Sequence, residues 1–308
     1  MNKLLTILTV ALLIGACEDQ INPTLQEAPP VTVIDAFINN LDSTQIVRIT
    51  QTQAYFDNTS LDGVLNAVVQ VTNNSSGAVF IFDHQGDGLY TWTPATSGAI
   101  GTEGNDYTLD VTIGEDAFRA LSTMNRVPPI DSVTFRFEEE NLFLPDSYFA
   151  EFWSRDPIGT GDTYWIKSYK NGVYLNQPNE INIAFDAGFS EGGNVDGLIF
   201  IPPVRDAINP FVEDANDDFL SPFADGDSVY VELHSITNET FDFLNEVRTQ
   251  TDRPGGFAEL FASPLSNVSS NIQYLGTDSE MQILGFFNVS AVVGSGKRLD
   301  ITTVPRPD

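Results

Sequence analysis

The amino-acid sequence predicts a mainly β protein in which a β-sandwich is followed by a second β-rich domain with one notable helix. Short segments that alternate apolar and polar residues recur along the chain, and Gly, Asn, Asp and Pro separate them, as is typical of β-strands. One segment near residue 240 instead carries apolar residues at helical spacing. Hydrophobic residues make up 42% of the 308 positions, which is a globular value and excludes a wholly disordered chain.

The first domain is predicted over residues 31–126. Seven short strands are expected within it, and this density of strands suggests an immunoglobulin-like or prealbumin-like β-sandwich. The segment His84-Gln85-Gly86-Asp87-Gly88 is expected to form a hairpin turn between two of them, because glycine tolerates positive φ angles. The expected strands are Val31–Ile38, Gln45–Thr52, Val64–Thr72, Ala78–Phe82, Leu89–Thr93, Tyr107–Ile113 and Phe118–Thr123.

The second domain is predicted over residues 127–308. Its boundary is Val127-Pro128-Pro129-Ile130, because consecutive prolines hold the chain extended and do not fit inside a sheet. Residues 204–227 are expected to form a long acidic loop between strands. The expected strands are Ser132–Phe137, Tyr148–Arg155, Thr163–Tyr169, Ile181–Phe185, Leu198–Ile201, Ser228–Ser235, Met281–Val293 and Leu299–Thr303.

The predicted helix covers Glu239–Thr249. Asn238 can cap its start, and Pro254-Gly255-Gly256 stops the chain soon after its end. Three apolar residues recur at helical spacing and define one face of this helix, namely Phe241, Leu244 and Val247.

The N-terminus has the pattern of a secretory signal peptide over residues 1–16. One basic residue, Lys3, precedes an apolar run that is shorter than the roughly 20 residues needed to span a bilayer. The run ends in Ile14-Gly15-Ala16-Cys17, which resembles the lipobox of bacterial lipoproteins. The resemblance implies cleavage before Cys17 and attachment of diacylglycerol to its thiol, with residues 17–30 as the lipidated cysteine and tether. An ordinary signal peptide with an incidental cysteine is the alternative.

Two acids, Glu18-Asp19, follow that cysteine directly. They resemble the signal that sends lipoproteins in Bacteroidota to the outer face of the outer membrane. The protein is therefore expected to be lipid-anchored in the outer membrane and to face the cell exterior. An anchor that faces the periplasm is the alternative.

The charge of the chain limits its partners. There are 43 acidic and 14 basic residues, which give a formal net charge of −29. Such a surface repels phosphate backbones and anionic headgroups, so no nucleic-acid partner is expected, and membrane contact is expected through the lipid anchor only. A single Cys and two His exclude an intramolecular disulfide, a thiolate metal cluster and a His-rich metal site.

Several landmarks follow one another in an order that is typical of one protein family. They are the lipobox, the proline-containing tether, the Val127–Val133 junction, Val229–Thr237 leading into the helix, Gly255-Gly256-Phe257, Ser263–Val268 and Gly285-Phe286-Phe287. In this order they resemble a family of Bacteroidota outer-membrane lipoproteins known as domain of unknown function 4249, which has no established activity. Because its members are typically encoded beside TonB-dependent outer-membrane receptors, the resemblance implies a binding or accessory subunit of a TonB-dependent uptake system.

No catalytic residue is predicted, and the chain is interpreted as a non-enzyme. A Ser-His-Asp site needs a histidine beside a nucleophile, and neither His84 nor His234 is accompanied by a Gly-x-Ser-x-Gly motif. Two alternatives to the binding subunit stay open. One is a surface hydrolase acting on glycan or peptide, and the other is a structural or assembly component of the cell envelope.

No metal site or cofactor is predicted, and a calcium site in the acidic loop is the alternative. The oxygen ligands that calcium prefers are concentrated at Asp214, Asn216, Asp218, Asp225 and Asp227. The run lacks the glycine and the distal glutamate of an EF-hand loop. The expectation is a solvated acidic loop that binds no metal.

The same loop places phenylalanines among its acids. Phe211, Phe219 and Phe223 either form a contact surface for a partner or tuck onto the domain. A partner that buried two of them would compensate for the repulsion between the neighbouring acids.

Overall fold

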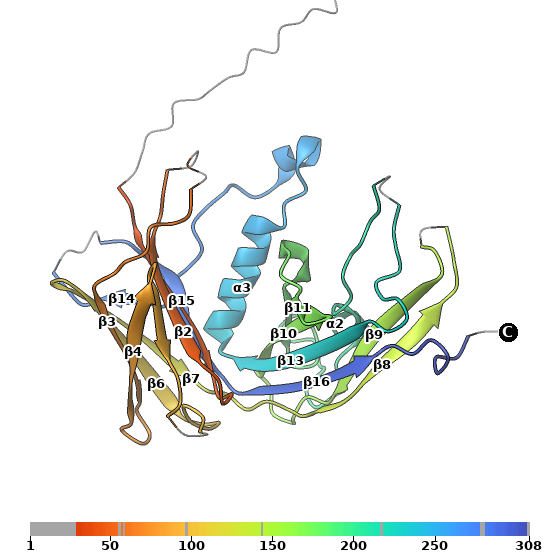
Figure 1. Cartoon of the computed structure of the whole chain (residues 1–308), viewed down its shortest axis with the longest axis horizontal. Helices are drawn as coiled ribbons and strands as arrows, with labels where there is room; N and C mark the ends of the chain where they lie inside the picture. Colours follow the sequence, from red (N-terminus) through yellow and green to blue (C-terminus); the bar gives the residue numbers. More distant parts are fainter. Residues whose placement is uncertain are drawn as a thin grey trace, which may run out of the picture.

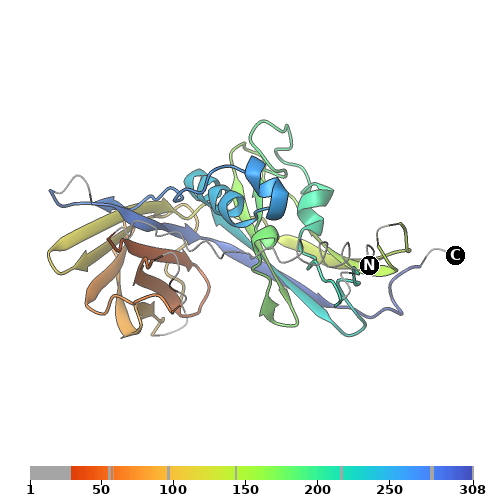
Figure 2. The same cartoon turned by 90° about the horizontal axis from the view of Figure 1, so that it is seen from above.

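The computed structural model confirms a mainly β protein and describes residues 29–54, 57, 59–95, 98–142, 144–215, 218–277 and 281–306. Two sheets lie side by side along the long axis of the molecule, and helix α3 (Asn238–Thr251) stands between them (Figure 1). Seen from above, the blue segment that carries β15 and β16 runs from one sheet into the other (Figure 2). The two parts of the fold therefore share a continuous stretch of chain.

The first sheet has nine strands in the order β14-β7-β6-β3-β4-β5-β2-β1-β15. It is nearly closed, because the Val289 amide of β15 reaches across to donate to Ser122 Oγ of β7 at 3.0 Å. The immunoglobulin-like or prealbumin-like arrangement within it stays a prediction. The strands are β1 (Thr32–Asn39), β2 (Gln45–Gln51), β3 (Ala67–Asn73), β4 (Val79–Gly86), β5 (Leu89–Trp92), β6 (Asp106–Ile113), β7 (Asp116–Thr123), β14 (Gln273–Tyr274) and β15 (Ile283–Ser290).

The alternation in the sequence places one side of each strand in the core of this sheet. In β2, Val47 and Ile49 are fully buried, whereas Ile46 and Arg48, which alternate with them, are exposed. Each fully buried aliphatic side chain of this size contributes about 2 kcal/mol to folding. The hydrophobic pattern therefore fixes which face of β2 turns inward.

Strands from late in the sequence complete the first sheet. β1 pairs in parallel with β15 over its full length, from Thr32 opposite Ile283 to Asn39 opposite Ser290. β14 pairs with β7 near the other edge. The sheet therefore crosses the predicted division at residue 127 and contains strands from both sides of it.

The second part of the fold contains a sheet in the order β11-β10-β13-β16, with β12 also paired to β10, and a separate β8–β9 hairpin. Its core includes the fully buried rings of Phe152, Tyr164 and Phe200. The elements are β8 (Ile130–Glu138), β9 (Ser147–Ser154), β10 (Thr163–Lys170), β11 (Val173–Tyr174), β12 (Asn182–Phe185), β13 (Ser228–Ile236), β16 (Val292–Arg298), η1 (Pro178–Glu180), α2 (Pro202–Asp206) and η2 (Gly256–Phe261).

The structure corrects three of the expected strands. Residues 198–201 and 299–303 form no strand, although Leu299 is buried in the core. The expected strand over 281–293 divides at Ala291 into β15 and β16, which belong to different sheets. Ser235 holds this junction, because its hydroxyl accepts from the Ala291 amide at 3.0 Å and its own amide donates to the Ala291 carbonyl at 2.9 Å. A continuous apolar run does not reveal such a crossing.

Helix α3 is confirmed, with its cap one residue earlier than expected. Thr237 is the N-cap, because its Oγ1 accepts from the Thr240 amide at 3.2 Å, and Asn238 is already the first helical residue. On the side of the helix that meets the first sheet, Phe243 packs against Phe286 of β15. This contact sets the distance between the helix and the outside of the nearly closed sheet.

Candidate functional site

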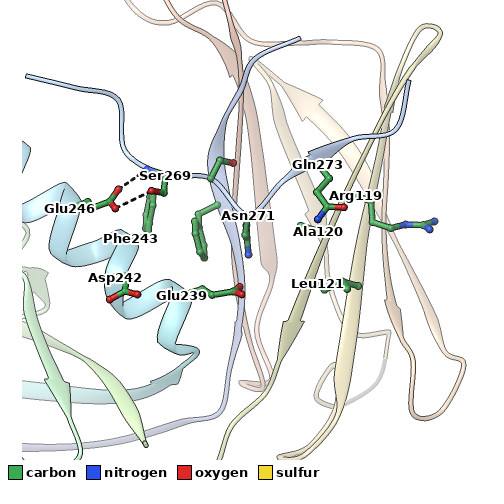
Figure 3. Close-up of a pocket in the computed structure, with 12 residues that line it drawn as sticks. Arg119, Ala120, Leu121, Glu239, Asp242, Phe243, Glu246, Ser269, Asn271 and Gln273 are labelled. Carbon is green, nitrogen blue, oxygen red and sulfur yellow. Dashed lines mark hydrogen bonds between the residues drawn. The ribbon is translucent and has the colours of Figure 1, made fainter. Parts of the chain in front are cut away.

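A groove between α3 and the outer wall of the first sheet is the candidate binding site. Its cavity has a volume of about 450 Å³, within the range of small-molecule sites. Its walls come from α3, from β7 and from residues 269–273, and Phe286 of β15 also lines it (Figure 3). The groove therefore lies where the helix of the second part meets the strands that complete the first sheet.

One wall of this groove is acidic. Glu239, Asp242 and Glu246 are three and four residues apart, so they share one face of α3. The carboxylate of Glu246 already accepts two hydrogen bonds, from the Ser269 amide at 2.7 Å and from the Ser269 hydroxyl at 3.0 Å (Figure 3). The side chains of Glu239 and Asp242 are exposed and make no hydrogen bond or ion pair within the described part of the chain. Two carboxylates are thus available to a ligand.

The wall opposite the helix leaves the groove net acidic. The guanidinium of Arg119 on β7 is directed away from α3 (Figure 3), and its Nε donates to Asp110 Oδ1 at 2.7 Å. This ion pair neutralises the one basic residue among the residues that line the groove. Leu121, two residues along the same face of β7, is 62% exposed and offers apolar contact area.

The base of the groove is held by packing and by side-chain hydrogen bonds. Phe243 and Phe286 stack with ring centroids 4.5 Å apart, and both are almost fully buried. Asn271 joins the lining to β15, because its side-chain amide donates to the Phe287 carbonyl at 2.8 Å and accepts from the Phe287 amide at 2.9 Å. These contacts hold the walls in place without a ligand, which lowers the ordering cost of binding.

This arrangement favours a ligand that combines a cationic group with an apolar part. An exposed carboxylate paired with a cation contributes roughly 0.2–1 kcal/mol, so Glu239 and Asp242 together select for charge without binding tightly. The described residues that line the groove include no histidine or cysteine. The groove therefore has the composition of a site for such a ligand.

Both histidines lie outside the groove. His84 belongs to β4, and the turn that was expected to contain it is reduced to Asp87-Gly88. His234 is buried, with its Nε2 3.1 Å from Glu232 Oε2. Burial lowers the pKa of His234 to about 4 despite this carboxylate, so the ring is neutral at pH 7. Among the described residues no serine hydroxyl bonds to either ring.

Three carboxylates beside the second sheet form a group that could hold a metal ion. Asp156, Asp186 and Asp196 each place an oxygen within 4.8 Å of the others, and a search of the described residues finds this group alone. Asp156 accepts from the Tyr164 hydroxyl at 2.7 Å, and Asp186 accepts from the Gly161 amide at 2.8 Å. Carboxylate oxygens fixed in this way are the ligands that calcium prefers.

The like charges in this group oppose one another. Burial raises the pKa of Asp156 above its ordinary value of 3.8, and the neighbouring Asp162 and Asp186 raise it further, against hydrogen bonds that lower it. Because the folded-state pKa exceeds the unfolded value, Asp156 favours folding at low pH, and this contribution is lost as the pH rises through the raised pKa. A divalent cation would offset the repulsion at neutral pH.

We expect calcium to raise the melting temperature of the mature protein. Calcium at ten times its dissociation constant adds about 1.4 kcal/mol to the native state, which corresponds to a rise of about 3 °C. Asp186→Asn should abolish the rise, and Asp218→Asn in the acidic loop should retain it. Scanning calorimetry with and without calcium measures both. A wild-type protein that does not respond would show that the three carboxylates hold no calcium.

The first half of the candidate calcium loop is closed by its own hydrogen bonds. The Asp218 amide donates to the Asp214 carboxylate at 3.0 Å, and Glu213 and Phe219 form a β-bridge beside them. Asn216 lies outside the described residues. Among the described residues of this part, the Asp214 carboxylate is therefore bound to the loop itself.

The second half of the loop binds other parts of the fold. Asp225 accepts from the Ile301 amide at 3.1 Å, and Asp227 forms an ion pair with Lys170 at 3.2 Å. The described carboxylates of the candidate calcium site are thus used in separate contacts, and they form no group of three that could hold a metal. This contradicts the alternative of a calcium site in the acidic loop.

The loop phenylalanines divide into buried and exposed residues. Phe223 is fully buried, with its ring 5.3 Å from that of Phe135, so its interpretation as a partner contact is corrected. Phe211 is 60% exposed, and its ring lies 5.2 Å from that of the half-buried Phe219. These two stay available for contact with a partner.

The predicted lipid-attachment residue, Cys17, lies outside the described residues, as do Glu18-Asp19. In the described part of the chain no helix combines the length and the apolar character that crossing a membrane requires.

Sequence reasoning missed both the groove and the group of three carboxylates. The acidic face of α3 could have been found, because Glu239, Asp242 and Glu246 follow helical spacing. The second group carries no such signal, because Asp156 and Asp186 look like any other acid in a chain that contains 43.

A comparison with protein-family models matches residues 18–295 to the family described as Domain of unknown function (DUF4249). The chain belongs to the DUF4249 family. The match takes in the groove, the group of three carboxylates and both sheets apart from the last residues of β16. The order of motifs in the sequence therefore identified the family correctly. A search of curated proteins finds no match to this DUF4249 chain.

Proposed function

We propose that the protein is a lipoprotein of the outer membrane, displayed on the cell surface, that serves as a binding subunit of a TonB-dependent uptake system. The observation that carries the proposal is the groove beside α3, with two available carboxylates and a base already in place. Its ligand combines a cationic group with an apolar part. Membership of the DUF4249 family supports the uptake role through the gene neighbourhood that the resemblance implies.

The weakness of the charged contacts suits a subunit that hands its ligand on. Glu239 and Asp242 are exposed, so each contributes only roughly 0.2–1 kcal/mol to binding of a cation. Affinity differences between related complexes lie mostly in the dissociation rate, so such contacts allow rapid release. A transporter beside the lipoprotein then receives the ligand without competition from a tight site.

The lipid anchor follows from the lipobox and from the position of the only cysteine at its end. Cys17→Ser removes the thiol that accepts diacylglycerol, and the tether by itself has little apolar surface to hold the chain to a bilayer. We expect this variant to leave the membrane fraction or to keep its signal peptide. Cell fractionation and the mass of the mature protein measure both outcomes.

The matched control is Ser43→Ala, which also removes one small polar group but lies beyond the tether, before β2. It should stay in the membrane fraction with the wild type. Mild-detergent purification of the wild type should also recover a TonB-dependent receptor. Normal processing and an unaltered membrane fraction for Cys17→Ser would contradict the anchor, and purification without any outer-membrane barrel would contradict the partner.

A further inference from the structure

One edge of the molecule carries both the start of the described chain and the far end of α3. β1 begins opposite Ile283 in a parallel pair, so β1 and β15 start at the same edge. The later turns of α3 reach this edge too, because Glu246 binds Ser269 and Ser270 donates to the carbonyl of Gly285 near the start of β15. In Figure 1 this is the upper edge, where the red start of β1 and the blue η2 segment lie.

The segment that follows α3 presents two phenylalanines to solvent at this edge. We call residues 255–265 the aromatic tip. Phe257 is 79% exposed and Phe261 is 80% exposed, with ring centroids 5.6 Å apart, and Leu265 is 64% exposed. Large apolar side chains grouped in this way mark a contact surface for a protein or a membrane.

Arg253 holds the aromatic tip in place and neutralises its charge. Its one acid, Glu259, pairs with Arg253, and Arg253 also donates to the Ser263 carbonyl at 2.9 Å. In a chain with a net charge of −29, this segment therefore reaches solvent with apolar side chains and no unpaired charge. Such a surface suits an apolar medium and has no charge with which to select an ionic partner.

Other loops extend the same edge. The described parts of the loops at 139–146 and 207–222 point in the same direction as η2 (Figure 1). They carry Leu142, which is 96% exposed, and Phe211, which is 60% exposed. The same loops also carry exposed acids, among them Glu139, Glu140 and Glu213, so the apolar contact area of this edge is concentrated at the aromatic tip.

The position at which the described chain begins indicates what this edge contacts. The residues between Cys17 and Pro29 reach at most about 40 Å when fully extended, at 3.3–3.6 Å per residue. A lipid at Cys17 therefore keeps the edge that contains the start of β1 close to the bilayer. Aromatic side chains prefer the interface between headgroups and acyl chains, which is the first apolar medium that this edge would meet.

We propose that the aromatic tip inserts Phe257 and Phe261 into the interface of the bilayer that holds the lipid anchor. The inference rests on the proposed anchor at Cys17 and adds a second, protein-borne contact with the membrane. In this arrangement, the edge that carries the start of β1 and the aromatic tip faces the bilayer.

The test uses the lipidated full-length mature protein in phosphatidylcholine vesicles. Lipidation occupies the thiol of Cys17, so Phe257→Cys supplies a single site for a nitroxide spin label. We expect the label to lose accessibility to a water-soluble nickel complex while it keeps accessibility to oxygen, which partitions into lipid. Phe261→Cys should behave in the same way, and because both side chains are exposed, neither change removes a core contact.

Ile81→Cys is the matched control, because Ile81 is 61% exposed but lies in β4 (Figure 1). Its label should stay accessible to nickel. The inference would be overturned if, in the lipidated protein on vesicles, the labels at Phe257→Cys and Phe261→Cys stay as accessible to nickel as the label at Ile81→Cys. Shielding that is already present without vesicles, in protein carrying Cys17→Ser, would indicate contact with another protein surface and would also overturn it. A mass that lacks diacylglycerol at Cys17 would contradict the proposed anchor instead, and the seating with it.

Discussion

Gly285→Ala is expected to lower the melting temperature of the mature protein by about 10 °C, through a loss of about 3–5 kcal/mol. Gly285 has a φ of 94°, which a residue with a Cβ rarely adopts. An added Cβ would also lie 2.0 Å from the carbonyl oxygen of Ile34 in the paired strand β1. Backbone strain and steric overlap would therefore both destabilise the parallel β1–β15 pair, which completes the first sheet.

The effect should reach the groove, because Phe286 follows Gly285 directly and stacks on Phe243 at the base. Gly77→Ala is the matched control. Its φ is 74°, but an added Cβ meets no atom within 4 Å, so only about 1 kcal/mol of backbone strain is expected. Thermal unfolding followed by circular dichroism compares the two variants. Equal losses in both would contradict the account of β1–β15 as the pair that holds the sheet together.

The sequence predicted the individual strands well, because a strand that is buried on one face alternates apolar and polar residues along its length. β2 illustrates this, since Val47 and Ile49 turn inward while Ile46 and Arg48 turn outward. The pairing of β1 with β15 left no such signal. Both strands are apolar on the side that faces the core, and nothing local in either records that its partner lies at the other end of the sequence.

The sites were less predictable because their residues come from distant segments. The acidic face of α3 is visible in the sequence, but its meaning depends on Leu121 and Asn271, which arrive from β7 and from the segment before β14. Phe223 shows the opposite error. A phenylalanine among acids in a loop suggested a contact surface, yet the loop returns to the core and buries it completely. Composition alone does not separate these two outcomes.

The second large effect is expected from removing the charge of the groove. Glu239→Gln combined with Asp242→Asn should weaken binding of a cationic ligand about tenfold, because each carboxylate contributes roughly 0.2–1 kcal/mol and 1.4 kcal/mol corresponds to a factor of ten. The fold should be retained, since both side chains are exposed and make no hydrogen bond or ion pair within the described chain. Added salt should reduce the wild-type affinity in the same direction.

The matched control removes equal charge elsewhere. Glu115→Gln combined with Asp131→Asn neutralises two exposed acids that do not line the groove. It lowers the net negative charge of the protein by the same amount, so it isolates the local effect of the groove from long-range attraction. Its affinity for a cationic ligand should stay close to that of the wild type.

The most direct test of the binding role is a calorimetric titration of two capped dipeptides into the mature protein. N-acetyl-arginyl-leucinamide carries the cationic and apolar groups that the groove favours, and N-acetyl-glutamyl-leucinamide reverses the charge at similar size. The account predicts binding of the arginine peptide alone, weakened by Glu239→Gln with Asp242→Asn and retained by Glu115→Gln with Asp131→Asn. Equal binding of both peptides, or an arginine-peptide affinity that the groove variant leaves unchanged, would contradict it.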